Sequence, residues 1–173
     1  MKTLLKIFVY GTLKKGFANH DSFCGGVLRI ERARLCGRLF KLMPDIPVMV
    51  VPDREILARG TGNVASDLEL QGRFESGASA PPPTGAVSVE PDAACKGWKR
   101  INGEVLFFDD PETRLPLIDG LEEFRPGGAS TYVRVLVRAA LADGSLTTAW
   151  TYVAGFDTGE LDGYEGETWF PGG

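Results

Sequence analysis

One carboxylate falls where a helix should be apolar. Residues 110–124 are predicted to form a helix, because Asp110 suits the N-cap and a proline follows at the first helical position. At about 100° per residue, Glu122 lies on the same half of this helix as Leu115 and Ile118. Loss of hydration there would raise the pKa of this acid, and a carboxylate so tuned is a useful general base near neutral pH.

The helical pattern alone leaves other interpretations of this acid open. Glu122 could lie at the edge of the apolar stripe, or it could pair with Arg134 or Arg138 on the strand that follows. The same helical geometry places Asp119 and Glu123 more toward the polar side. Glu122 is therefore the first candidate for a base, and Glu123 is its nearest rival.

A second candidate element lies near the N-terminus. Residues 7–10 are aromatic and β-branched and predict a buried strand that breaks at Gly11. A loop that leaves a strand in this way has backbone N–H groups that are not committed to a ladder, and such groups can bind a carboxylate or an oxyanion. The alternative is an ordinary strand followed by a glycine turn.

Further strands should position these two elements. Alternating or continuous apolar runs predict them, and a turn-forming Asp-Gly pair joins the last two as a hairpin. The predicted strands are 35–42, 46–51, 101–108, 131–138 and 147–153, with the turn at Asp143–Gly144. Between them, residues 52–99 show a weaker pattern and include the Pro-, Ala- and Gly-rich run 78–85, which predicts a surface excursion. The tail 154–173 is rich in glycine, with Trp169 and Phe170 as candidate anchors.

The length, composition and net charge of the chain exclude several classes of protein. The 173 residues fit one domain, 1–173, and the composition, 43% hydrophobic and 24% charged, is that of an ordinary globular protein. A net charge of −4 gives no support to binding of nucleic acid or of anionic membranes. No apolar run approaches the roughly 20 residues that span a bilayer. We expect a cytoplasmic protein that binds a small molecule.

The cysteines and the single histidine suggest no metal site. Cys24, Cys36 and Cys95 are odd in number and lack CxxC spacing, so we expect reduced thiols and no disulfide framework. His20 and Cys24 could form half of a metal site, but no second pair with ligand spacing is present. The preferred interpretation is a structural histidine whose ring bonds a nearby backbone group.

Two blocks of sequence resemble one known family. Val9 to Gly16, which contains Tyr-Gly-Thr-Leu, is followed by Asn19-His20 and resembles the N-terminal signature of the γ-glutamylcyclotransferase-like proteins. Within that superfamily it is most similar to the AIG2-like, or γ-glutamylamine cyclotransferase, branch. Residues 101–153 resemble the family's second half, with its Gly-Glu-Val strand, Asp-Pro-Glu cap, Ile-Asp-x-x-Glu helix and Tyr-x-Arg strand. The two blocks cover most of the chain outside 52–99.

This resemblance implies a fold and a site. The fold would be α+β, with a mixed, barrel-like sheet, a few flanking helices and a cavity at its mouth. Glu122 falls on the position of the catalytic base in active relatives, and no metal or organic cofactor is implied. The implied substrate-binding residues are Tyr10, Gly11, Thr12, Leu13 and Tyr132.

The implied activity is that of a γ-glutamyl cyclotransferase, an amide-cyclising enzyme of the acyltransferase or lyase type that releases 5-oxoproline. The alternatives are a ligand-binding member of the same fold without catalysis, and an enzyme that removes a γ-glutamyl group from a biosynthetic intermediate. Within the chain, Leu161 to Gly166 also has the spacing of the family's Asp-x-x-Glu motif, which makes Glu165 a rival base. The rival lacks a surrounding helix of apolar periodicity and a following Tyr-x-Arg strand, so Glu122 is preferred.

Overall fold

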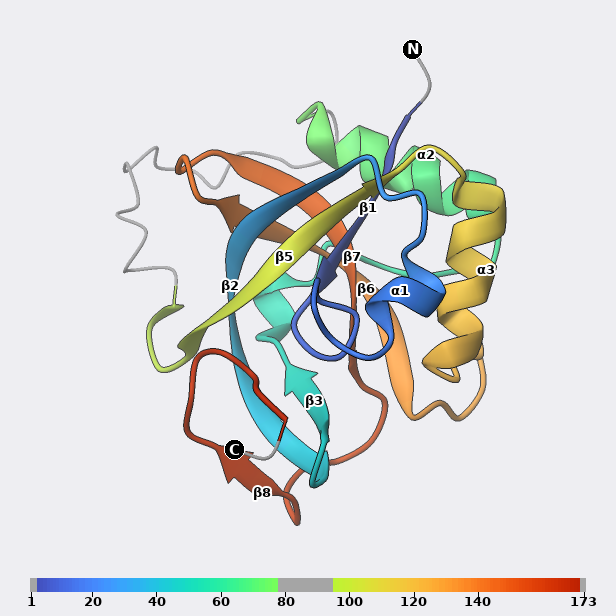
Figure 1. The fold of residues 1–173 in the computed structure, drawn as a ribbon. Coiled ribbons are helices and arrows are strands. Elements are labelled where there is room, and N and C mark those ends of the chain that lie inside the picture. Colours follow the sequence, from blue (N-terminus) through green and yellow to red (C-terminus); the bar gives the residue numbers. More distant parts are fainter. Residues whose placement is uncertain (1–2, 78–94, 172–173) are drawn as a thin grey trace.

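The chain folds around a closed five-stranded barrel. The structure, a computed structural model, describes residues 3–77 and 95–171. Around the barrel the strands run in the order β2 (Arg29–Met43), β5 (Lys99–Phe108), β1 (Leu5–Val9), β7 (Leu146–Ala154) and β6 (Tyr132–Leu141) (Figure 1). Pairing of β2 with β6, Ala33 opposite Leu141, closes the ring. β1 and β7 are parallel and the other neighbours antiparallel, so the sheet is mixed.

Short strands extend this barrel at its margins. The long strand β2 continues past the barrel and pairs with β3 (Ile46–Val50) on one side and with β8 (Asp162–Tyr164) on the other. A two-residue strand, β4 (Ala58–Arg59), pairs with β6. The expected hairpin is confirmed, because β6 and β7 pair along their length and Asp143 and Gly144 lie in the turn between them.

The core divides into two layers that follow the alternation of the strands. In β1, Phe8 packs with Val105, Val137 and Trp169 in one cluster, whereas Ile7 belongs to a second cluster. Because neighbouring residues of a strand face opposite sides of a sheet, the first cluster fills the barrel and the second lies between the barrel and the helices.

The helices cover one side of this barrel (Figure 1). They are α1 (His20–Phe23), α2 (Val64–Glu75) and α3 (Pro111–Leu121); the 3-10 turn η1 (Asp53–Glu55) follows β3 in the chain. α3 starts with Pro111 after Asp110, as expected, but the Asp110 carboxylate pairs with Arg114 instead of capping the backbone. It buries Leu115 and Ile118. The prediction of an α+β, barrel-like fold with flanking helices is thus confirmed, and in the described residues no helix is long and apolar enough to cross a membrane.

The expectation that residues 52–99 are a surface excursion is wrong for its first half. This half contains η1, β4 and the 12-residue helix α2, which packs against β7 and α3. The helix escaped detection because its buried positions include two polar residues, Asp67 and Gln71. Gln71 donates to the Leu4 carbonyl and accepts from the Lys6 N–H, so it bonds the backbone beside β1. The expectation for residues 78–94 lies outside the described residues.

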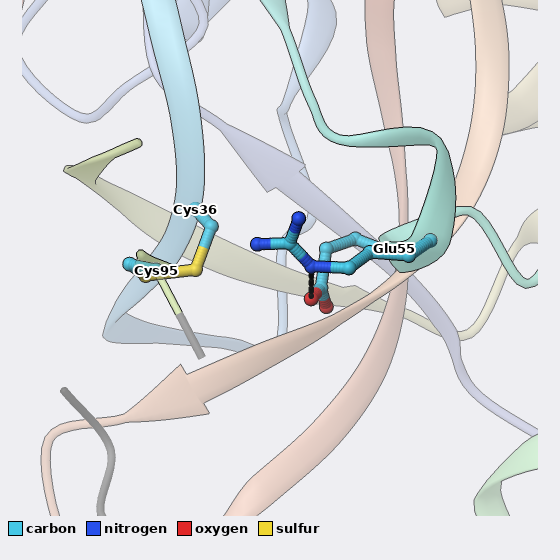
Figure 2. The surroundings of a disulfide bond; sticks show 4 residues. Cys36, Glu55 and Cys95 are labelled. Carbon is cyan, nitrogen blue, oxygen red and sulfur yellow. Dashed lines mark ion pairs between the residues drawn. A yellow bond between two sulfur atoms is a disulfide. The ribbon is translucent and has the colours of Figure 1, made fainter. Parts of the chain in front are cut away.

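The expectation of reduced thiols is wrong for two of the three cysteines. Cys36 on β2 and Cys95, 59 residues apart, form a disulfide with a Cα–Cα distance of 5.3 Å (Figure 2). The spacing of cysteines in the sequence does not reveal such a pair, because only the path of β2 brings the two residues together. Cys24 is free and buried, and its burial raises the pKa of the thiol to about 11.

The tail is anchored by one of its two candidate anchors, Trp169 and Phe170. Trp169 is fully buried and packs against Tyr164 of β8, whereas Phe170 is 56% exposed. The Trp169 carbonyl accepts a hydrogen bond from Lys14 Nζ, which ties the tail to the N-terminal part of the chain.

Candidate active site

A cavity of about 520 Å³ opens where the end of β1, the end of α3 and strand β3 meet. Its size is within the range of sites for small molecules. All six residues expected at the site line this cavity: Tyr10, Gly11, Thr12, Leu13, Glu122 and Tyr132. The lining also includes the polar residues Asn19, Glu123, Thr131 and Tyr152 and the apolar residues Leu42, Met43, Ile46, Pro47 and Leu121.

Close packing explains why a glycine begins the loop that follows β1. A Cβ atom on Gly11 would lie 2.8 Å from Cγ of Pro47 on β3, nearer than real Cβ contacts come. The same residue of β3 accepts, through its carbonyl, a 2.7 Å hydrogen bond from the Tyr132 hydroxyl. Pro47 therefore joins two walls of the cavity, and it leaves no space for a side chain at position 11.

The three carbonyl groups of residues 11–13 all take part in hydrogen bonds within the N-terminal part of the chain. The Lys14 N–H donates to Gly11, the Asn19 N–H to Thr12, and Nδ1 of His20 lies 2.8 Å from the Leu13 oxygen. The three N–H groups of the same residues make no hydrogen bond within the described residues. Since the carbonyl groups hold the loop in place and its N–H groups have no acceptor in the described residues, these N–H groups are available to a ligand in the cavity.

His20 has the structural role that we expected. Its ring nitrogen Nδ1 can bond the buried Leu13 carbonyl only as a donor, so the ring holds the 11–13 loop in place. The Asn19 side chain adds a 2.9 Å hydrogen bond to the Thr12 hydroxyl. No cluster of metal-ligating side chains is present in the described residues.

Two buried tyrosines brace the cavity rather than offer free hydroxyls. The Tyr10 hydroxyl donates to the Tyr152 carbonyl at 2.8 Å and accepts from the Met49 N–H at 3.2 Å. Burial, with Tyr132 and Glu122 nearby, raises the pKa of Tyr10 well above its ordinary value. Burial also raises the pKa of Tyr132, and Glu122 adds to the effect. Both phenols therefore stay neutral near pH 7.

The end of α3 determines where Glu122 points. Glu122 is the C-cap residue, one position past the helix that ends at Leu121. The following residue, Glu123, has a left-handed φ of 54°, and Phe124 N–H bonds back to the Asp119 carbonyl at 2.9 Å. This is the Schellman arrangement, which usually has glycine at the left-handed position. A glutamate with φ > 0 is uncommon, and it makes the chain turn sharply beside the cavity.

Glu122 has no ion pair and no hydrogen bond through its carboxylate within the described residues. Loss of hydration, with the charge of Asp119 as the second cause, raises its pKa to about 7. The alternative that Glu122 pairs with Arg134 is not what the structure shows, because Arg134 binds Asp67 and Asp119. The carboxylate is left facing the cavity with a pKa near neutrality.

The surroundings of Asp119, which the helical pattern places toward the polar side, differ from the prediction. Asp119 instead accepts from Arg134 Nε at 2.8 Å and from the Tyr152 hydroxyl at 2.7 Å. A signal was present, because Tyr132 and Arg134 are two residues apart on β6 and therefore share a face of the strand. Arg134, on the same face of the strand as Tyr132, would be buried near the site, and a buried arginine needs a carboxylate partner such as Asp119.

The two rival acids lie in different environments. Glu165 is on the tail, its side chain is 93% exposed, and it pairs with Lys99 at 2.8 Å, away from the cavity lining. Glu123 does line the cavity, but it is exposed at the rim and its carboxylate accepts from the Thr131 hydroxyl. Of the three acids, only Glu122 combines a place in the cavity with a carboxylate that has no partner.

Comparisons with known proteins agree with the fold. The chain is similar to the YkqA protein of Bacillus subtilis, at 19% identity and a TM-score of 0.54, over 96% of this chain but only 39% of that one. It is also similar to an AIG2-like protein of Mus musculus, at 16% identity and a TM-score of 0.53, over 96% of this chain and 88% of that one. These likenesses show the fold alone, and none of the curated proteins matches the chain.

The match to a family model identifies the family of the chain in addition to its fold. The family described as gamma-glutamyl cyclotransferase, AIG2-like, matches residues 7–71 and 84–170, which include the 10–13 loop, Glu122 and Tyr132. This match extends over most of the 173 residues, and the chain belongs to the gamma-glutamyl cyclotransferase, AIG2-like family.

Proposed function

We propose that this chain is a γ-glutamyl cyclotransferase, which converts a γ-glutamyl compound into 5-oxoproline and an amine or amino acid, with Glu122 as the general acid and base. One observation supports the proposal above the others. The Glu122 carboxylate and the three N–H groups of residues 11–13, none of which has a hydrogen-bond partner among residues 3–77 and 95–171, belong to residues that line the same cavity. The former can move a proton, and the latter can hold the negative charge of a substrate.

In the proposed reaction the nucleophile belongs to the substrate. The α-nitrogen of the γ-glutamyl group attacks its own γ-carbonyl carbon, a C–N bond forms, and the bond from that carbon to the leaving nitrogen breaks. Because the two reacting atoms are already tethered, the protein must chiefly fold the substrate into a reactive shape. The braced walls of the cavity at Tyr10 and Tyr132 suit that task.

Glu122 would move the protons of this reaction. The substrate's α-ammonium, with a pKa of about 8, loses two protons before the lactam is complete, and the leaving nitrogen gains both. A base with a pKa of about 7 can accept a proton from that ammonium and still return it to the leaving nitrogen. The N–H groups of residues 11–13 would stabilise the negative charge that develops on the γ-oxygen.

The walls of the cavity also suggest which leaving groups fit. The cavity lining contains the carboxylates Glu122 and Glu123 and no Lys, Arg or His side chain in the described residues. Leu42, Met43 and Ile46 add an apolar wall. A leaving group with its own carboxylate would meet like charge without a compensating cation, so we expect neutral or cationic amines to be better substrates than γ-glutamyl dipeptides.

The test is the release of 5-oxoproline from γ-glutamyl alkylamines, γ-glutamyl-ε-lysine, γ-glutamyl dipeptides and glutathione. We expect wild-type protein to turn over at least one of these compounds, and Glu122→Gln to lose about 10²–10⁴-fold in kcat. Glu165→Gln, the same chemical change in the exposed tail segment, is the matched control and should keep full activity.

Three outcomes would contradict parts of the proposal. Full activity of Glu122→Gln would place the base elsewhere, and Glu123→Gln would then be tested. Binding of the compounds in a calorimeter without any turnover would favour a ligand-binding member of the fold. Turnover restricted to one large γ-glutamyl conjugate would favour removal of a γ-glutamyl group from a biosynthetic intermediate.

A further inference from the structure

A buried cluster of charges lies directly behind the cavity. Arg134 on β6 is fully buried and binds two acids, Asp67 of α2 at 2.8 Å and Asp119 of α3 at 2.8 Å. The side chain of Asp67 is also fully buried, and that of Asp119 is 16% exposed. Three elements thus contribute charges to one cluster, and two carboxylates share a single cation.

The surroundings of the cluster hold the guanidinium and Asp67 tightly. The N–H and the hydroxyl of Thr61 both donate to Asp67 Oδ1. The guanidinium lies over the ring of Trp150, 4.8 Å from its centroid, and a Cβ on Gly60 would come within 2.9 Å of Arg134 Cζ. Because the guanidinium of Arg134 is packed on several sides, it cannot move when a charge in the cavity changes.

The cluster reaches the cavity through Asp119. Its Oδ1 atom accepts from Arg134 Nε and from the hydroxyl of Tyr152, a residue of the cavity lining. Asp119 also precedes Glu122 by three residues, so the two acids lie on the same face near the end of α3. The two carboxylates and one guanidinium leave a net charge of −1, and Asp119 is the carboxylate of the cluster that binds a residue of the cavity lining.

We propose that Asp119 is a positioning residue for the reaction: held by Arg134, it fixes the Tyr152 hydroxyl at the cavity wall and keeps a negative charge one helical turn before Glu122. This inference rests on the proposed function of Glu122. Asp119 does not touch the reacting atoms. Its effect is to fix one wall of the site and to make Glu122 a stronger proton acceptor than an isolated, solvated carboxylate.

The other groups around Glu122 cannot supply the same effect. The titratable side chains that face it are Tyr10 after β1, Tyr132 on β6 and Tyr152 on β7, and burial raises the pKa of all three phenols. They are therefore neutral near pH 7. Glu123 is the adjacent residue but is exposed to solvent, which screens its charge. Asp119 is thus the ionised group that acts on Glu122 from inside the protein.

The experiment titrates Glu122 directly, so that it does not depend on turnover. The protein is labelled with ¹³C at the glutamate δ-carbon, and the Glu122 signal is assigned by its absence in Glu122→Gln. In wild type we expect a midpoint of about pH 7. In Asp119→Asn, which keeps the shape but removes the charge, the midpoint should fall by on the order of one pH unit. Asp110→Asn, at the other end of the same helix, should leave it unchanged.

A second variant covers the case in which Asp119→Asn does not fold. Asp119→Glu keeps the charge but moves the carboxylate by one methylene group. We expect its Glu122 midpoint to stay near that of wild type, while kcat falls at least tenfold with little change in KM, because the Tyr152 hydroxyl is no longer held. Its stability is followed by thermal unfolding.

Two results would overturn the inference. One is a wild-type midpoint for Glu122 in a folded Asp119→Asn protein, and the other is full kcat in Asp119→Glu. Absence of turnover in wild type would instead count against the proposed function, and the titration would still decide whether Asp119 acts on Glu122.

Discussion

Two segments of the chain have nearly the same sequence but adopt different secondary structures in different surroundings. Residues 118–122 are Ile-Asp-Gly-Leu-Glu, and residues 161–165 are Leu-Asp-Gly-Tyr-Glu. The first forms the end of α3, with Glu122 facing the cavity, whereas the second runs through the short strand β8 at the margin of the sheet. The pKa of Glu122 is raised by burial, and that of Glu165 is lowered by its hydrogen bond to Lys99.

Residue types alone do not decide the chemistry of an acid. Both segments have an aspartate three residues before the glutamate, but only Asp119 is bound to a buried arginine. Glu165 has a lysine beside it and water around it, so its charged form is stable. Glu122 has no cation beside it in the described residues and has lost much of its hydration, so its neutral form is favoured and its pKa rises to about 7.

The largest loss of stability should come from removing Arg134, the buried cation that binds Asp119 of the first segment. Arg134→Met would leave Asp67 and Asp119 buried without their partner, and we expect a loss of about 3–5 kcal/mol in the free energy of unfolding. Lys99→Met, which removes the partner of Glu165, should cause no resolvable change. Chemical denaturation of both variants is the measurement, and equal losses would contradict the contrast between the segments.

A smaller effect should come from the disulfide, which lies on the side of the second segment. Cys95 is linked to β2 only four residues before Lys99, the partner of Glu165. Replacing Cys36 and Cys95 together with serine opens a link across 59 residues, and we expect a loss of about 2–4 kcal/mol.

In that double variant, local unfolding should be confined to the region around β8 and should not reach the cavity. Hydrogen exchange should increase in β8 and at the start of β5, while the ¹³C titration of Glu122 should not change. A shift of the Glu122 midpoint would show that the tail and the cavity are coupled, which this structure does not predict.

The smallest effect should appear in how stability depends on pH. The folded pKa of Glu122, about 7, lies above its unfolded value near 4.5, so the folded state holds its proton over the range in which the unfolded state has lost it. Stability therefore falls as pH rises from about 4.5 to 7. Relative to Glu122→Gln, wild type should lose roughly 2–3 kcal/mol across this window.

Glu165 should give the opposite sign in the same experiment. Its pKa is lowered in the folded state, so its contribution is present above the unfolded pKa and is lost as the pH falls. Unfolding free energies of wild type, Glu122→Gln and Glu165→Gln between pH 3 and pH 8 test both signs, because the Glu165 effect lies below pH 4.5 and the Glu122 effect above it. A constant difference between wild type and Glu122→Gln would mean that Glu122 is not desolvated.

Elements whose side chains follow a simple period could be predicted from the order of the residues. The strands of the barrel apart from residues 29–34 of β2, the hairpin turn at Asp143–Gly144 and the start of α3 after Asp110 were predictable, because burial of one face leaves an apolar repeat. Glu122 could be singled out for the same reason, as an acid in an apolar repeat. The helix α2 could not, because its buried positions include the polar Asp67 and Gln71.

Contacts between residues that are distant in the chain could not be predicted in this way. The pair Cys36–Cys95, the three-element cluster around Arg134 and the different surroundings of Glu122 and Glu165 each depend on strands that are far apart in the chain. The physical reason is that a pKa and an ion pair depend on the dielectric and the charges within a few ångströms. Local sequence periodicity shows which face of an element is buried, but it does not show what lies opposite that face.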